Sequence, residues 1–355
     1  MKLIATFLTK MILIRFGAIL FGLSAFVLTL EVVSFLTEIA KIEDNTLYAV
    51  GYYCLMRLPA IVSLFLPTSL LLALLLTITE LSYRNELTAI WATGISPAGV
   101  IGMLLPMALV IGGFHYLIND QVIPSTAPVL RKWGIGDYAT RKLSSDVNQP
   151  IWIRSGNDLM RADHVTADGE TLEGLILFRR EPSGQLKEQL FVKNAYQNSG
   201  RWLLNDVTIY YSTGEQPTHL ANMVYDGEMR LASYKIASPE EMTLQELGTF
   251  VANDGFGVRP AYVYDTWWQK RLTPVFTAIV MIALVVPLGT RFRRGGGLGL
   301  IFAAGVGLGF VYFVGEGIAM TMGEAGSVRP WLAAWGPILL FAALAVVLLA
   351  RTDQA

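Results

Sequence analysis

The chain has 355 residues, of which 53% are hydrophobic and 15% are charged, and its formal net charge is −1. Soluble domains carry about 25% charged residues, so this composition excludes an ordinary soluble globule, and the balanced charge excludes a nucleic-acid-binding protein with a basic surface. The charges are also unevenly spread, because 31 of the 55 lie between Gln121 and Tyr262. The sequence therefore predicts a membrane protein with a water-soluble domain inserted in its middle.

Six apolar stretches are long enough to cross a hydrocarbon core, which needs about 20 residues. They are predicted near Ile12–Leu36, Leu58–Thr79, Val100–Ile118, Leu272–Gly289, Gly297–Met322 and Trp331–Ala350. The second stretch is the clearest, since LPAIVSLFLPTSLLLALLLTIT contains no charge. The first follows two lysines and has no small-residue cleavage site after a short apolar core, which indicates a retained signal anchor.

The basic residues of the short loops predict the orientation of these spans. One side of the membrane holds Lys2, Lys10, Arg84, Arg291, Arg293, Arg294 and Arg351. Because cytoplasmic loops are enriched in lysine and arginine, we expect both termini in the cytoplasm. The predicted domains are then 1–119 (spans one to three), 120–262 (an outer domain, periplasmic in a Gram-negative host) and 263–355 (spans four to six). The single cysteine, Cys54, would lie at the outer surface, and it excludes an internal disulfide.

The loop between spans two and three predicts a short amphipathic helix over about 82–95. Gly94 is the expected residue after its C-terminus, and Ser96 and Pro97 are the expected cap and first residue of span three. Leu87, Ile90 and Trp91 gather on one side of this helix, beside the polar Glu86. Such a helix either lies in the membrane interface or docks into a groove of a soluble partner.

The central segment is predicted to form β-strands. Runs such as LEGLILFRR, KEQLFVKNAYQ and GRWLLNDVTIYY are separated by the turn signals Asp168-Gly169, Ser183-Gly184 and Ser199-Gly200. This spacing predicts an antiparallel β domain of sandwich, jelly-roll or open-barrel type. Such a domain is either a folded cap or a surface that handles an apolar ligand or a partner's strand. A short helix capped by Ser238 is expected to follow at about 239–252.

Ionisable residues near the outer ends of the spans are candidate functional groups. The cations are Lys41, Arg57, Lys270, Arg271 and Arg329, and they stand at the level of an anionic lipid head group in the outer leaflet. The alternative is that they only extend from helix ends toward water. Glu31 and Glu316 are expected to pair with these cations or with another chain, and His115 lies at the same level without an assigned role.

Small residues in span five are spaced for close helix packing or for a gating contact. They form two rows, Gly295/Gly299/Ala303/Gly307 and Gly305/Gly309. A phosphate-binding loop is excluded, since nothing matches G-x-x-x-x-G-K-[ST]. Hydrolase and metalloprotease motifs are also missing from the sequence, so we expect no catalytic residues, no metal site and no cofactor, and any energy for transport must come from a partner.

Three segments together resemble the LptF/LptG permeases of the lipopolysaccharide export system. They are LPTSLLLALLLTITELSYRNELTAIWATGIS with Glu86 and Gly94, YDTWWQKRLTPVFTAIVMIALVVPLG with Lys270 and Pro274, and WLAAWGPILLF. The short C-terminus and the YDTWWQK segment look more like LptG than LptF. Relatives often carry a basic residue late in span one, where this chain has Ser34, so Lys41 is the cation that the resemblance assigns there.

The resemblance implies a non-catalytic subunit of an ATP-driven exporter with six membrane helices and a periplasmic jelly roll. It would pair with a paralogous LptF-like permease, bind a cytoplasmic LptB-like ATPase dimer through the helix containing Glu86, and work beside a single-span LptC-like bridge protein. The cargo would be lipopolysaccharide drawn from the outer leaflet of the bacterial inner membrane. Two alternatives remain: an ATPase-coupled mechanical protein that moves no lipid, and a membrane-anchored scaffold for envelope assembly.

Overall fold

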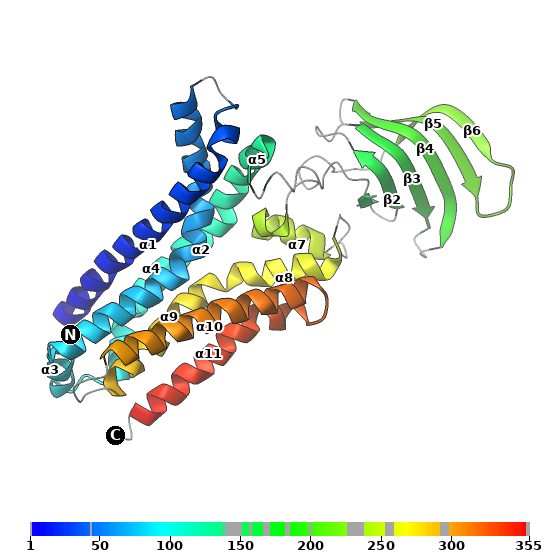
Figure 1. The fold of residues 1–355 in the computed structure, drawn as a ribbon. Coiled ribbons are helices and arrows are strands. Elements are labelled where there is room, and N and C mark those ends of the chain that lie inside the picture. The colour runs from blue at the N-terminus through cyan, green and yellow to red at the C-terminus, as the bar shows by residue number, and fades with distance from the viewer. Residues whose placement is uncertain are drawn as a thin grey trace. The chain divides into compact units, whose positions relative to one another are not determined.

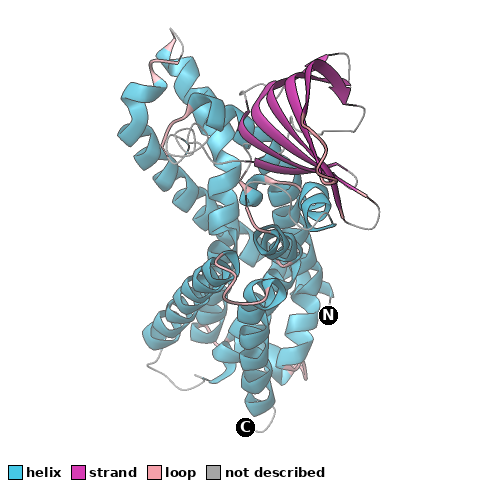
Figure 2. Cartoon of the chain, turned by 90° about the vertical axis from the view of Figure 1, so that its right-hand side faces the viewer, coloured by secondary structure: helices cyan, strands magenta, loops and turns pink. Residues whose placement is uncertain are grey.

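The computed structural model describes residues 2–42, 45–136, 138, 151–155, 158–165, 171–181, 185–198, 201–225, 238–252, 259–291 and 298–352. It contains two compact units: Met1–Tyr138 together with Asp265–Ala355, and the inserted segment Ala139–Tyr264. The first unit is helical and the second holds an antiparallel sheet (Figures 1 and 2). The predicted fold class, membrane helices with an inserted antiparallel β domain, is confirmed.

Five helices of the described residues are long and apolar enough to cross a membrane. These five helices are α1 (Lys2–Ile39), α2 (Thr46–Tyr83), α4 (Pro97–Leu117), α10 (Leu298–Glu324) and α11 (Pro330–Thr352). α1 and α2 have 38 residues each, which is about 57 Å of helix. A hydrocarbon core is about 30 Å thick, so both helices extend well beyond it.

The fourth predicted span is a bent pair of helices rather than one continuous helix. α8 (Ala261–Leu272) and α9 (Pro274–Arg291) meet at an angle of 53°, and the described residues hold six candidate spans if this pair counts as one. Pro274 has no N–H to donate to the preceding turn, and the Thr273 hydroxyl donates instead to the Lys270 carbonyl at 2.8 Å. The bend therefore sets Lys270 just before the apolar helix α9.

The third predicted span continues past its expected end at Ile118. A π-helical turn (Ile118–Val122) joins α4 to α5 (Ile123–Trp133), and the helical unit reaches Tyr138 rather than residue 119. Asp120 in this turn is buried, and the Gln121 amide donates to its carboxylate at 2.7 Å. This extension was not predicted from the sequence, because α5 is amphipathic and lacks the continuous hydrophobicity of a span.

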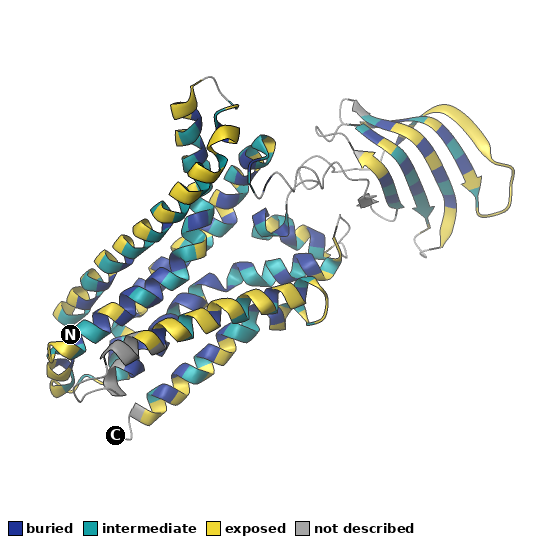
Figure 3. Ribbon diagram, in the orientation of Figure 1, coloured by how far each residue is buried: buried dark blue, intermediate teal, exposed yellow. Residues whose placement is uncertain are grey.

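α2 and α9 occupy the centre of the helical unit. In the most apolar window of α2, 61% of residues are buried, against 11% in α1 and 17% in α10 (Figure 3). α9 contacts α2, α4 and α11, and it meets α4 so closely that a Cβ on Gly112 would lie 2.5 Å from the Val275 Cα. α1 and α10 consequently leave broad apolar faces for lipid or for another protein chain.

The described strands of the inserted unit form one six-stranded antiparallel sheet with strands in sequence order. Its strands are β1 (Ile151–Ser155), β2 (Asp158–Val165), β3 (Thr171–Arg180), β4 (Leu186–Asn198), β5 (Arg201–Tyr211) and β6 (Thr218–Tyr225). Alternate residues form an apolar core around Trp202, which is 1% exposed. The described strands are a meander, and the more specific jelly-roll interpretation stays a prediction.

The helix expected over 239–252 begins later than predicted. Pro239–Glu241 is one 3₁₀ turn, and α7 runs only from Leu244 to Ala252. Thr243 caps α7, because the Glu246 N–H donates to the Thr243 hydroxyl at 3.2 Å and the Thr243 N–H donates to the Glu246 carboxylate at 2.8 Å. This reciprocal pattern is a capping box. The α-helix therefore starts after Thr243, and Ser238 and Pro239 begin only the 3₁₀ turn.

Candidate functional site

The expected cytoplasmic helix is present but shorter than predicted. α2 continues to Tyr83, Asn85 takes a left-handed conformation (φ 60°), and α3 spans only Glu86–Ala92. Gly94 follows with φ +82°. Ser96 caps α4 as predicted, since its hydroxyl accepts the Gly99 N–H at 3.1 Å.

The apolar side of α3 faces the chain's own core. Leu87 and Ile90 are 3% and 9% exposed and belong to the apolar cluster of the helical unit, α3 contacts α2, and Trp91 is partly buried against the same cluster. Leu87 and Ile90 are thus largely covered within this chain, and their predicted contact with a partner stays a prediction. The outward side presents Thr88, Ala89 and Ala92, with Glu86 half-buried beside them.

Arg57 and Glu31 form a bidentate ion pair between α2 and α1. The Arg57 guanidinium donates from Nη2 to Oε1 at 2.7 Å and from Nε to Oε2 at 2.9 Å, and it lies 5.8 Å from the centre of the Tyr138 ring. The predicted pairing of Glu31 with one of the cations is confirmed. Arg57 is thus engaged by Glu31 within the chain, and its contact with a lipid head group stays a prediction.

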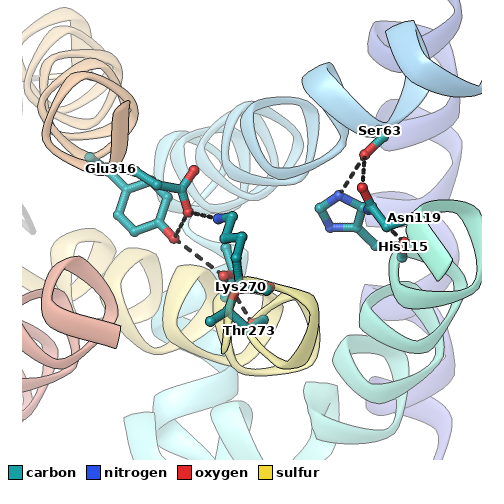
Figure 4. A network of polar contacts seen from close by, with 8 residues as sticks. Ser63, His115, Asn119, Lys270, Thr273 and Glu316 are labelled. Carbon is teal, nitrogen blue, oxygen red and sulfur yellow. Dashed lines mark hydrogen bonds and ion pairs between the residues drawn. The ribbon is translucent and has the colours of Figure 1, made fainter. Parts of the chain in front are cut away.

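Lys270 and Glu316 form a second ion pair, between α8 and α10 (Figure 4). The Tyr312 hydroxyl donates to the same Glu316 oxygen at 3.1 Å and lies 3.2 Å from the Thr277 hydroxyl. Lys270 therefore stands at the end of a chain of polar groups that links α8, α9 and α10. The predicted pairing of Glu316 is confirmed as well.

This second pair lines an open groove of about 610 Å³. The remaining wall is mainly apolar and includes Trp267, Phe313, Val314, Ile318, Met320 and Met322. The lysine and glutamate side chains keep 23% and 19% of their surface exposed, so a ligand in the groove can reach them. One ion pair among apolar walls suits an amphipathic molecule that has a charged end and hydrocarbon chains.

His115 belongs to a separate polar cluster between α2 and α4 (Figure 4). Its Nε2 lies 3.1 Å from the Ser63 hydroxyl, which also lies 3.0 Å from Asn119 Oδ1. The Asn119 amide donates to the His115 carbonyl at 2.8 Å. The histidine therefore has a packing role in joining two membrane helices, which the sequence left unassigned.

The other predicted cations have different surroundings. Lys41 and Arg329 are exposed, whereas Arg271 is 3% exposed and lies in the helical core. Within the described residues, the five cations thus do not share one environment. No group of three or more His, Cys, Asp or Glu in this described part is placed to hold a metal ion.

The two small-residue rows of α10 face different surroundings. A Cβ on Gly305 or Gly309 would overlap the side chain of Leu75 or Leu71 in α2, respectively. Gly307 has no heavy atom near its ideal Cβ, and Ala303 is exposed. Gly299 belongs to the row of Ala303 and Gly307 by its spacing in α10, and Gly295 of that row lies outside the described residues. The Gly305/Gly309 row thus makes the close packing inside this chain, and a gating role for either row stays a prediction.

Sequence reasoning missed a third ion pair, at the opposite end of the same helices. Arg15 of α1 pairs with Glu80 of α2, and Glu80 also pairs with Arg84 at 2.8 Å. The available signal was an arginine inside the first predicted span, since a buried cation in a membrane helix requires a partner. Its partner was not evident because Glu80 lies 65 positions along the chain.

The comparisons with known proteins agree with this architecture. No curated protein sequence matches the chain. The sequence profile of the family described as "Lipopolysaccharide export system permease LptF/LptG" matches residues 6–351, which is nearly the whole chain. That family comprises permeases, and its match covers both helical segments and the inserted sheet. The chain is therefore a multi-pass membrane protein that belongs to the LptF/LptG family of lipopolysaccharide export permeases.

Proposed function

We propose that this chain is one of two permease subunits that extract lipopolysaccharide from the outer leaflet of the bacterial inner membrane. The observation that carries the proposal is the groove between α8 and α10, in a chain of the lipopolysaccharide permease family. In its Lys270–Glu316 pair, the lysine is a cation that an incoming phosphate can bind in place of the glutamate. Its apolar wall supplies a surface for acyl chains, which gain roughly 0.8 kcal/mol for each CH₂ group removed from water.

The groove lies on the helix that continues from the inserted unit. Lys270 sits within two turns of Tyr264, where that unit ends, and Pro274 bends the chain directly after it. A change in the angle between α8 and α9 would therefore move Lys270 together with the start of α8. We infer that lipid leaves the groove toward the β unit, which would pass it to a single-span LptC-like bridge protein.

The power for this transfer would come from a cytoplasmic LptB-like ATPase dimer bound at α3. The outward residues Glu86, Thr88, Ala89 and Ala92 form the proposed contact, while buried Leu87 and Ile90 fix α3 to the membrane helices. The exposed apolar faces of α1 and α10 would contact a paralogous LptF-like permease. This assigns the chain the LptG-like place, a choice that its YDTWWQK segment supports.

Both termini would then be cytoplasmic and the sheet periplasmic. Lys41, exposed at the end of α1, and Arg329, exposed before α11, would contact the lipid beside Lys270. Arg57 and Arg271 would act through the packing of the helices, because Glu31 holds the former and the core encloses the latter.

The proposal is tested by purifying the complex gently from native membranes and weighing its proteins and lipids by mass spectrometry. We expect a paralogous permease, an ATPase and bound lipopolysaccharide. Lys270→Gln should lower the bound lipopolysaccharide about tenfold, the effect of losing roughly 1.4 kcal/mol, whereas Lys10→Gln, an exposed lysine at the other end of the bundle, should not.

The alternative functions give different results in the same experiment. An ATPase without glycolipid, and no effect of Lys270→Gln, would identify a mechanical protein that moves no lipid. A complex that lacks an ATPase altogether would identify an assembly scaffold.

A further inference from the structure

Arg15 places a cation on the face of α1 that packs against α2. It follows Leu8 and Ile12 at helical spacing, and those two residues are 1% and 0% exposed in the shared core. The Arg15 guanidinium pairs with Glu80 Oε2 and donates from Nη1 to the Thr77 hydroxyl at 3.3 Å. The Thr77 hydroxyl in turn donates to the Ala73 carbonyl at 2.7 Å. Arg15 therefore contacts the last two turns of α2.

Glu80 joins this contact to the cytoplasmic helix. Its other oxygen, Oε1, lies 2.8 Å from Nη2 of Arg84, which caps the C-terminus of α2. Asn85 then takes the left-handed conformation that turns the chain, and α3 begins at Glu86. One carboxylate is thus bonded at the same time to α1 and to the turn that leads into α3.

The two halves of this junction have different exposure. The Arg15 and Glu80 side chains are 23% and 34% exposed, whereas Arg84 is 61% exposed. Exposed ion pairs contribute little, so the Arg15–Glu80 bond is the stronger of the two. Leu87 of α3 is buried in the apolar cluster of the helical unit, and α3 contacts α2, so packing against α2 is a second connection between α3 and the helix that carries Glu80.

We propose that Glu80 is a positioning residue that couples movement of α3 to α1. A force on α3 reaches α1 through the Arg84–Glu80–Arg15 contacts, in parallel with the packing of Leu87. α1 is the least buried of the candidate spans, at 11%, and most of its contacts are with α2, so a change at this junction acts on the main contact that holds α1. The proposal rests on the proposed docking of an ATPase at α3.

The test uses the reconstituted complex and measures lipopolysaccharide transferred per ATP hydrolysed. Glu80→Gln and Arg15→Gln should each lower this ratio about fivefold, the lower end of typical coupling, while the bound ATPase stays unchanged. The double variant should lose no more than either single one, because both remove one shared interaction. Arg84→Gln should have a smaller effect, and Glu38→Gln, an exposed carboxylate at the far end of α1, should have none.

A second measurement does not depend on transport. With Cys54 replaced by serine, spin labels at exposed Leu13 of α1 and exposed Thr93 after α3 report the distance between the two helices. Glu80→Gln should broaden this distance distribution, and Glu38→Gln should leave it narrow. An unchanged distance distribution in Glu80→Gln overturns the proposal, and so does an unchanged transfer ratio in a complex that binds the ATPase and moves lipid.

The two hypotheses fail in different ways. If the wild-type chain binds no ATPase, the proposed function is wrong, yet broadening in Glu80→Gln still supports the link between α1 and α3. If the ATPase binds and lipid moves, but Glu80→Gln transfers as much lipid per ATP as the wild type, only the positioning role is wrong.

Discussion

Arg57 of α2 donates hydrogen bonds of 2.7 Å and 2.9 Å to the carboxylate of Glu31 of α1. The Arg57 and Glu31 side chains are only 16% and 20% exposed, so their charges are largely removed from water. A paired charge in such a place costs little, but either charge left alone costs much more. The pair therefore ties α1 to α2 in addition to the apolar contacts between those helices.

Glu31→Gln is expected to destabilise the purified protein, because it removes the negative charge that faces the Arg57 guanidinium at 2.7 Å. The loss should be about 2 kcal/mol, between an exposed and a fully buried pair. Thermal unfolding in detergent measures it. Glu38→Gln, exposed on the same helix, should change stability by less than about 0.5 kcal/mol. Equal stability of the two variants would contradict the tie.

Gly112→Ala is expected to disrupt the contact between α4 and α9. The new Cβ would meet the backbone of Val275, which cannot rotate away as a side chain can, and overpacking typically costs about 1–3 kcal/mol. Gly113→Ala is the matched control, since nothing lies within 4 Å of its Cβ and alanine is the better helix former. The melting temperatures of the two variants should differ in opposite directions from the wild type.

The two sides of α3 should respond differently to substitution. Leu87→Ala empties part of the core and should cost about 2–4 kcal/mol of stability. Glu86→Lys and Ala89→Trp change the outward side, so they should leave stability and membrane insertion intact while abolishing ATPase binding and stimulated export. Co-purification with the ATPase, measured beside thermal unfolding, separates the effects. ATPase binding by both outward variants would refute the proposed contact.

Ser63→Val is expected to weaken the contact between α2 and α4. It removes the hydroxyl that lies between His115 Nε2 and Asn119 Oδ1, and unsatisfied buried polar groups cost about 1–3 kcal/mol. Ser82→Val changes a half-buried serine near the end of the same helix and should be close to neutral. Thermal unfolding of both variants checks the difference.

The proposed orientation predicts one-sided labelling of the single cysteine. A membrane-impermeant maleimide added from the periplasmic side should reach Cys54, which is partly exposed near the start of α2. In a Cys54→Ser chain, a cysteine introduced by Thr88→Cys should react only after the membrane has been made permeable, so that the reagent reaches the cytoplasmic side. The reverse pattern would invert the topology.

Local features of this protein were predictable because each depends on residues close together in the sequence. Continuous hydrophobicity identifies the spans, Ser96 and Pro97 identify the start of α4, and Gly94 marks the turn after α3. The same local rules failed where two signals competed, as at Ser238 and Thr243, and where a helix changed character, as at the π turn from Ile118.

The sequence by itself determined that this is a membrane protein with an inserted antiparallel β domain, because hydrophobicity and cap chemistry act within single elements. Only the tertiary structure decided which charges meet: Glu31 with Arg57, Lys270 with Glu316, and Glu80 with Arg15. Those partners depend on the depth and rotation of two packed helices, which no local pattern specifies. The same reason explains α3, whose apolar side would satisfy either a partner's groove or the chain's own core, and packing assigned it to the core.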